Sequence, residues 1–201
     1  MGQLLQVQLP GAQPWPWGVA FDGANVWVAN GGASTVTKLR ASDGALLGTF
    51  NAGSLGPHGV AFDGVNGWVT TSGSSPILAK LRASDGALLA TYPLSASATG
   101  LAFDGANIWV THSSTNFVTK VRASDGTQLG VCTVPLGPAA VACDGTHVWV
   151  TSNSSGSVTK LRASDGSAVG TYPVGIAPVG VAFDGANIWV ANNFSNSVSK
   201  L

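Results

Sequence analysis

The feature of this sequence that most restricts its fold is a repeat. The tripeptide Phe-Asp-Gly begins at Phe21, Phe62, Phe103 and Phe183, and Cys-Asp-Gly takes its place at Cys143. A second motif, Arg-Ala-Ser-Asp-Gly, begins at Arg40, Arg82, Arg122 and Arg162. Both motifs recur at intervals of about 40 residues, a period typical of solenoids, propellers and helical arrays. Because no segment has the hydrophobic periodicity of an amphipathic helix, the helical arrays are excluded.

Each repeat divides into four short segments, which we name strands A to D. In the first repeat they cover residues 18–21, 26–29, 36–39 and 45–50, rich in β-branched and aromatic residues. The Asp-Gly pairs between strands supply residues that tolerate the positive φ of tight hairpin turns. Four antiparallel strands joined as a meander form a propeller blade. The sequence therefore predicts an all-β protein, a five-bladed β-propeller of four-stranded antiparallel blades that forms a single domain over residues 1–201.

The two ends of the chain complement each other. The last repeat, residues 180–201, ends after strand C, while residues 2–9 begin like a strand D, since Gly-Gln-Leu-Leu parallels Gly-Ala-Leu-Leu at 44–47. We expect the N-terminal strand over residues 2–9 to complete the C-terminal blade. Each strand type then occurs five times, which favours closure of the ring within one chain.

The pattern Gly-Val-Ala-Phe-Asp-Gly, Ile-Trp-Val and Val-Thr-Lys-Leu-Arg resembles the NHL and YVTN-type repeats of bacterial β-propellers, a group to which the streptogramin lyases are related. The resemblance covers almost the whole chain. It implies a propeller fold, and propellers of this group usually have six or seven blades. Five repeats therefore leave a domain-swapped or oligomeric larger ring as an alternative to the monomer that we expect. The lyases use a His and Glu set with magnesium, which this chain without Glu does not carry over.

Composition excludes several classes of function. The formal net charge is zero, and the nine Lys and Arg residues are dispersed. A nucleic-acid partner would require clustered basic residues, so none is expected. No apolar run is long enough to span a bilayer, and the N-terminus lacks the pattern of a signal peptide. We expect no membrane insertion, and the compartment stays open.

The charged residues belong to the repeated framework. All nine acidic residues are Asp and lie in two repeated turns, and all nine Lys and Arg occupy repeated strand C positions. Asp in such turns is explained by hydrogen bonds to the local backbone. Both sets of carboxylates are predicted on the face opposite the variable loops, which argues against a glycosidase. We expect no metal, cofactor or catalytic residue. Cys132 and Cys143 replace aromatic residues of other repeats and are interpreted as small core residues, with a disulfide as the alternative.

The variable positions predict a binding face. The D–A and B–C loops emerge on one face of a propeller, where they form a funnel that can bury a ligand. Two sets of equivalent positions are expected there. The set before strand A is Trp17, His58, Thr99, Ala139 and Val179, and the set after strand B is Asn30, Thr71, His112, Ser152 and Asn192.

Two features make this face a candidate site. Trp15 and Trp17, each preceded by Pro, form a stiff aromatic pair, interpreted either as a binding platform or as a cover over the channel or a blade edge. His58 and His112 could serve as bases or metal ligands, although loop histidines that only donate hydrogen bonds are commoner. The ligand-binding residues that we predict are Trp15, Trp17, Asn30, His58, Thr71, Thr99, His112 and Asn192.

Our hypothesis is a non-enzymatic binding or scaffold propeller for a small molecule or glycan. Two alternatives remain. The first is a streptogramin lyase-like enzyme with a His base, and the second is a symmetric scaffold without a small-molecule site.

Overall fold

The computed structural model describes residues 6–10 and 15–201. Its secondary structure consists of β-strands and two single 3-10 turns. The strands are β1 (Pro16–Phe21), β2 (Asn25–Asn30), β3 (Thr35–Arg40), β4 (Leu46–Asn51), β5 (Pro57–Phe62), β6 (Asn66–Thr71), β7 (Ile77–Arg82), β8 (Leu88–Pro93), β9 (Leu101–Phe103), β10 (Asn107–Thr111), β11 (Phe117–Arg122), β12 (Gln128–Thr133), β13 (Pro138–Cys143), β14 (His147–Ser152), β15 (Ser157–Arg162), β16 (Ala168–Pro173), β17 (Pro178–Phe183), β18 (Ile188–Asn192) and β19 (Ser197–Lys200). The two turns are η1 (Asn153–Ser155) and η2 (Asn193–Ser195).

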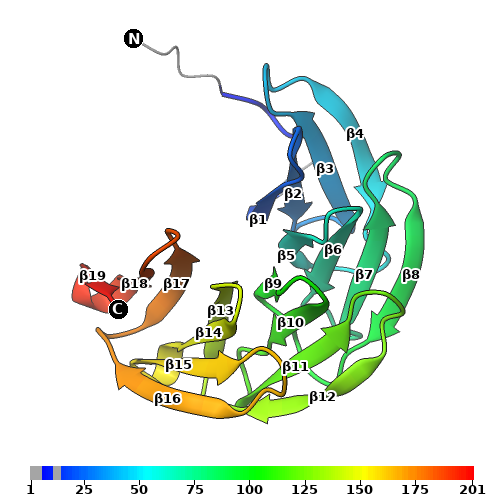
Figure 1. Ribbon diagram of the computed structural model, residues 1–201. Coiled ribbons are helices and arrows are strands. Elements are labelled where there is room, and N and C mark those ends of the chain that lie inside the picture. The colour runs from blue at the N-terminus through cyan, green and yellow to red at the C-terminus, as the bar shows by residue number, and fades with distance from the viewer. Residues whose placement is uncertain (1–5, 11–14) are drawn as a thin grey trace. The chain divides into compact units, whose positions relative to one another are not determined.

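These strands form five separate antiparallel sheets, one for each sequence repeat. In every sheet the strands follow chain order, so that each sheet is a meander (Figure 1). Four sheets contain four described strands, and the sheet β17–β18–β19 contains three. The predicted fold class, a five-bladed β-propeller of antiparallel blades, is confirmed. None of the helical turns in the described residues is long or apolar enough to cross a bilayer.

The chain divides into two compact units, residues 1–94 and 95–201. The first unit holds the blades β1–β4 and β5–β8, and the second holds the blades β9–β12, β13–β16 and β17–β19. In both units the second and third strands of a blade are the most buried, while the fourth strand is largely exposed. Strands B and C therefore form the core of these blades, which explains their high content of β-branched and aromatic residues, whereas β19 of the last blade is largely exposed.

Neighbouring blades within a unit pack through a close approach of their first strands. In the first unit, a Cβ added at Gly18 of β1 would clash with the carbonyl oxygen of His58 in β5. In the second unit, a Cβ at Gly100 would lie 2.9 Å from the carbonyl oxygen of Ala139 in β13. Glycine permits this approach because it has no side chain. The apolar cluster between the first two blades forms beside this contact and includes Trp27, Val36, Val60, Val69 and Leu81.

The predicted N-terminal strand falls partly outside the described residues. Of residues 2–9, positions 2–5 are not described, and positions 6–9 are not in a strand. Completion of the C-terminal blade by this segment, and the single domain that depends on it, stay predictions.

Candidate functional site

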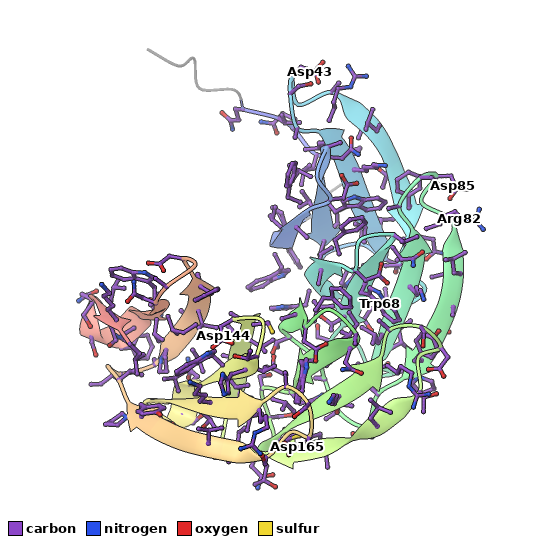
Figure 2. All side chains as sticks on the ribbon, viewed as in Figure 1. Asp43, Trp68, Arg82, Asp85, Asp144 and Asp165 are labelled. Carbon is purple, nitrogen blue, oxygen red and sulfur yellow. The ribbon has the colours of Figure 1, made fainter. Side chains whose placement is uncertain are left out.

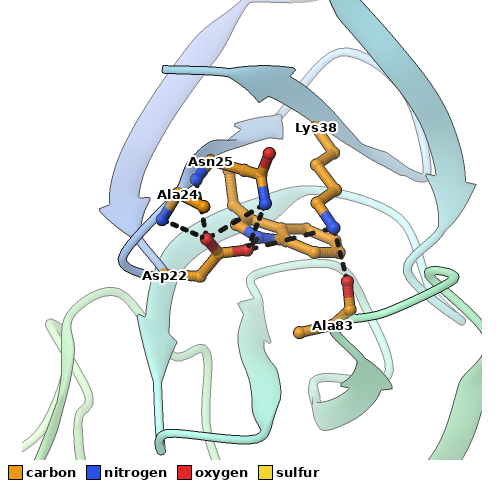
Figure 3. Close-up of polar contacts among 6 residues, drawn as sticks. Asp22, Ala24, Asn25, Lys38 and Ala83 are labelled. Carbon is orange, nitrogen blue, oxygen red and sulfur yellow. Dashed lines mark hydrogen bonds and ion pairs between the residues drawn. The ribbon is translucent and has the colours of Figure 1, made fainter. Parts of the chain in front are cut away.

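The Asp residue after each first strand organises the turn that follows it. In the first blade, Asp22 Oδ1 accepts hydrogen bonds from the backbone nitrogens of Ala24 and Asn25, at 3.0 and 2.7 Å (Figure 3). The other carboxylate oxygen accepts a bond of 2.8 Å from Trp27 Nε1. The predicted local role of these Asp residues is confirmed, whereas the bond to the indole was not foreseen. The signal for it was the constant five-residue interval between each Asp and the Trp of the next strand.

A lysine completes this arrangement. Lys38 Nζ lies 5.0 Å above the Trp27 ring and donates a bond of 2.5 Å to the carbonyl oxygen of Ala83 in the neighbouring blade (Figure 3). In the second unit, Lys120 Nζ contacts the Trp109 ring and donates to the carbonyl oxygens of Ala163 and Ser164, at 2.6 and 2.9 Å. At these two junctions the lysine of the Asp–Trp–Lys set therefore connects neighbouring blades. The set recurs as Asp22–Trp27–Lys38, Asp63–Trp68–Lys80, Asp104–Trp109–Lys120, Asp144–Trp149–Lys160 and Asp184–Trp189–Lys200.

The remaining Asp residues pair at the surface. Arg82 Nη1 lies 2.8 Å from Asp85 Oδ2, and the two side chains lie together at the outer edge of their blade (Figure 2). The equivalent distances in the other three blades are 2.9, 2.9 and 3.2 Å. Such exposed pairs contribute little to stability.

Hydrogen bonds hold the carboxyl groups of Asp63 and Asp165 in the ionised state. Burial by itself would raise the pKa of Asp63, but the hydrogen bonds from Trp68 and from the turn backbone outweigh it and lower that pKa. Backbone and side-chain hydrogen bonds from Ser167 lower the pKa of exposed Asp165 to about 2. A general acid needs a raised pKa at neutral pH. These Asp residues have the opposite shift, so they are unsuited to that role.

The predicted residues after strand B are buried. Asn30, Thr71, His112 and Ser152 have no exposed surface, and Asn192 is 2% exposed. Asn30 Nδ2 donates to the hydroxyl oxygens of Thr35 and Thr37, and Asn192 Nδ2 donates to those of Ser197 and Ser199. Thr71 Oγ1 accepts a bond of 2.9 Å from the backbone nitrogen of Ile77. These side chains connect strand B to strand C by hydrogen bonds. The variability of these positions in the sequence did not predict this structural role.

His112 is held inside its blade. Its Nδ1 lies 3.0 Å from the carbonyl oxygen of Ala96, and its Nε2 lies 2.8 Å from Thr119 Oγ1. Burial disfavours the charged ring and lowers the pKa of His112. The imidazole therefore stays neutral, with both nitrogens engaged, and has no free nitrogen for a metal or a substrate proton. No group of three or more metal-ligating side chains occurs within residues 6–10 and 15–201.

Thr99 is partly buried and likewise serves a contact between blades. Its hydroxyl lies 3.0 Å from Thr111 Oγ1 and donates to the carbonyl oxygen of Ala139 at 3.2 Å. Cys132 and Cys143 are free thiols packed against the core of the second unit, where burial raises the pKa of both. Their interpretation as small core residues agrees with this packing.

Trp15, Trp17 and His58 are the predicted site residues that present aromatic surface. Both tryptophan side chains are 62% exposed. The Trp17 ring stacks on the His58 ring with centroids 4.7 Å apart and an angle of 21° between the planes. A Cβ at Gly31 would clash with the Trp17 indole, so this glycine makes room for the stack. We name Trp15, Trp17 and His58 the aromatic platform.

Trp15 has a strained backbone. Its φ of 39° lies in the left-handed region, and its carbonyl oxygen accepts a bond of 3.0 Å from the Gly31 nitrogen. That conformation costs a bulky residue roughly 1–3 kcal/mol, and such strained residues occur in turns and cluster at functional sites. Burial does not compensate the cost, because the indole is exposed.

Comparisons with known proteins identify the fold alone. No family model matches the sequence, and no curated protein matches it. Among solved structures, a streptogramin B lyase superposes with a TM-score of 0.76 at 22% identity over 96% of this chain and 70% of its own. A catalytically inactive virginiamycin B lyase from Staphylococcus aureus with quinupristin gives 0.79 at 19% identity, over 96% of this chain and 67% of its own.

A third similar structure is the hydrazine synthase of Kuenenia stuttgartiensis, with a TM-score of 0.77 at 18% identity over 94% of this chain. The chain spans only 58% of the length of that protein. Proteins of different chemistry thus share this propeller fold, and fold likeness at such low identity does not transfer an activity.

Proposed function

We propose that this chain is a non-enzymatic binding module whose ligand contacts the aromatic platform of the first unit. The observation that carries the proposal is the exposed Trp17 indole, stacked on His58 and preceded by a second exposed tryptophan. Indoles are large apolar surfaces with a polar edge, and an exposed pair of them is costly in water unless a ligand covers it. The other predicted residues, Asn30, Thr71, Thr99, His112 and Asn192, position the loops instead.

A carbohydrate is the ligand class that suits this platform. The CH face of a pyranose is apolar and slightly positive, and it stacks on the electron-rich face of an indole. The His58 ring, next to Trp17, adds a polar edge. The platform is held before a ligand arrives, by the stack and by the hydrogen bond of the Trp15 carbonyl oxygen, which lowers the entropy cost of binding.

The chemistry of the described residues supports a binding module over an enzyme. The lowered pKa values of Asp63, Asp104 and Asp165 disfavour these side chains as general acids, and both ring nitrogens of buried His112 are engaged in hydrogen bonds. The streptogramin lyase-like alternative has only the fold likeness in its favour. It deserves a direct assay, because the structures with a similar fold include one with quinupristin.

The test is a ligand panel of mono- and oligosaccharides, with quinupristin added, read by thermal shift and by tryptophan fluorescence. A ligand that binds only the folded state raises the melting temperature by mass action. We expect a sugar to raise it in the native protein and in Val65→Ala, a control in an exposed turn at the other end of β5. We expect Trp17→Ala to lose this shift.

Two outcomes would contradict the proposal. A sugar shift that survives Trp17→Ala would place the site elsewhere, and the absence of any shift would favour the symmetric scaffold. Disappearance of quinupristin, followed by chromatography, would establish the lyase-like alternative. Circular dichroism of each variant ensures that a lost shift reflects lost binding rather than unfolding.

A further inference from the structure

The last described blade has an uncovered apolar face. The strand B tryptophans Trp27, Trp68 and Trp109 are 1% exposed or less, and Trp149 is 7% exposed. Their counterpart in the last blade, Trp189, is 38% exposed, and Val198 beside it is 62% exposed. The same repeat position is therefore core in four blades and surface in the fifth, whose sheet has three described strands and lacks the fourth-strand aromatic that packs on Trp27, Trp68 and Trp149.

In the junctions between packed neighbouring blades, the equivalent apolar face contacts the next blade. Between the first two blades, Trp27 packs in a cluster with Val60 and Leu81 of the next blade. Gly18 allows the backbone of β5 to approach β1, and Lys38 donates to the carbonyl oxygen of Ala83. The second unit repeats this scheme, with Gly100 against Ala139 and Lys120 bonded to Ala163. Each junction thus has two contacts. The glycine of one blade lies against the first strand of the next blade, and the lysine of the same blade donates to a carbonyl oxygen in the C–D turn of the next blade.

The last blade presents the groove half of this junction. A shallow hollow of about 330 Å³ is lined by Gly180, Val181, Ala182, Trp189, Ala191 and Val198. We name it the last-blade groove. Gly180 occupies the repeat position of Gly18, and a Cβ there would meet only Ala191 Cβ, at 3.6 Å. Lys200 Nζ lies 5.4 Å from the centroid of the Trp189 ring, as the bridging lysines do in covered blades.

The first blade presents the complementary half. Val19 and Phe21 of β1 are 64% and 59% exposed, whereas Val60 at the equivalent position in β5 is 8% exposed. Ala41 occupies the repeat position of Ala83, whose carbonyl oxygen accepts from a lysine. A hollow of about 660 Å³ lies beside it, lined in part by Phe21, Ala41 and Ser42. By analogy with Lys38 and Ala83, the lysine of a preceding blade would reach the carbonyl oxygen of Ala41 beside this hollow.

We propose that the last-blade groove binds the first blade of a second copy of this chain. β1 of the second copy takes the place that β5 takes against β1, and Lys200 donates to the carbonyl oxygen of the partner's Ala41. The occupant is inferred from complementarity, because this chain exposes both halves of a junction that it forms repeatedly in covered form. The contact is head-to-tail, so copies add to one another until a ring closes or a fibre grows.

The first experiment measures the mass of the full chain by sedimentation and light scattering over a roughly hundredfold dilution series. We expect a mass above the 20.2 kDa of one chain that falls on dilution. We expect tryptophan emission to shift to the red as Trp189 becomes exposed. A mass of one chain at every concentration would overturn the proposal, and it is the result expected if the two halves pair within one molecule.

Variants of the two halves make the test specific. Gly180→Leu fills the last-blade groove at a position with open space, and Phe21→Asp places a charge on the complementary face. We expect each variant alone to be a single chain. An equimolar mixture should form a heterodimer of twice 20.2 kDa, because each variant retains the half that the other has lost. Ala168→Leu places the same leucine side chain at an exposed position of β16 and should assemble normally.

The mixing experiment also decides between surfaces. Association that persists in both variants, or variants that stay single when mixed, would overturn the head-to-tail contact. The proposed contact and the aromatic platform share β1, because Trp17 and Phe21 both belong to that strand. Gly180 lies outside the platform, so a sugar screen on Gly180→Leu separates a failed sugar screen from a failed mixing experiment.

Discussion

The indole nitrogen of Trp109 donates a hydrogen bond of 2.7 Å to a carboxylate oxygen of Asp104. Because Trp109 has no exposed surface, removal of its acceptor would leave a buried donor without a partner. The same carboxylate also holds the turn through the backbone nitrogens of Ala106 and Asn107. This relationship recurs in every blade and gives the repeated Asp a structural role.

Asp104→Ala should therefore be strongly destabilising. We expect the free energy of unfolding to fall by about 1–3 kcal/mol, the cost of an unsatisfied buried donor. The matched control is Asp125→Ala, which removes an exposed partner of Arg122 and should cost less than about 1 kcal/mol. Urea denaturation followed by circular dichroism measures both values. Equal losses in the two variants would contradict the importance of the Trp109 bond.

His112 should make stability depend on pH near neutrality. Burial lowers the pKa of His112 in the folded state below its ordinary value of 6.5. As the pH falls below 6.5, the unfolded chain binds a proton that the folded protein does not, so the free energy of unfolding decreases. His112→Asn, which introduces the residue found at equivalent Asn30, should abolish this decrease between pH 6.5 and the folded pKa. An unchanged pH profile in the variant would assign the effect to another group.

The Asp residues should produce a second loss of stability in acid. The pKa values of Asp63, Asp104 and Asp165 are lowered in the folded state from 3.8, so the stabilisation that these carboxylates give is complete above that pH. It is lost as the pH falls through the folded pKa values, which for Asp165 means a pH of about 2. We expect the urea midpoint to be steady above pH 5, apart from the His112 effect, and to fall steeply below pH 4, as the sign of these shifts requires. Asp63→Asn should reduce that slope.

Gly100 and Gly180 should respond differently to the same substitution. A Cβ at Gly100 would lie 2.9 Å from the carbonyl oxygen of Ala139, so Gly100→Ala forces two strands apart. We expect a cost of about 1–3 kcal/mol, as for other overpacked sites. At Gly180 the nearest atom is 3.6 Å away, and Gly180→Ala should be neutral or stabilising by up to about 1 kcal/mol. Thermal unfolding at low protein concentration, where copies separate, provides the comparison.

The amino-acid sequence by itself determined the blade. The period of the Phe-Asp-Gly and Arg-Ala-Ser-Asp-Gly motifs placed the strands to within one or two residues at most ends, because the turns need residues of special backbone conformation at fixed positions. The local role of Asp22 and its counterparts followed from the same turn chemistry. These features depend on contacts between residues close in sequence, which a repeat makes visible.

Only the tertiary structure decided which variable side chains reach the surface. Trp17 and His112 both stand at variable positions next to loops, yet Trp17 is exposed and His112 is buried with both ring nitrogens bonded. The difference arises because the side chain of His112 turns toward strand C of its own blade, whereas Trp17 lies over a glycine and against His58. The hydrogen bond by which Lys38 connects two blades could likewise not be predicted from the sequence, because its acceptor, Ala83, is distant in sequence. Burial and hydrogen bonding between distant residues follow from packing, which a pattern of residue types does not specify.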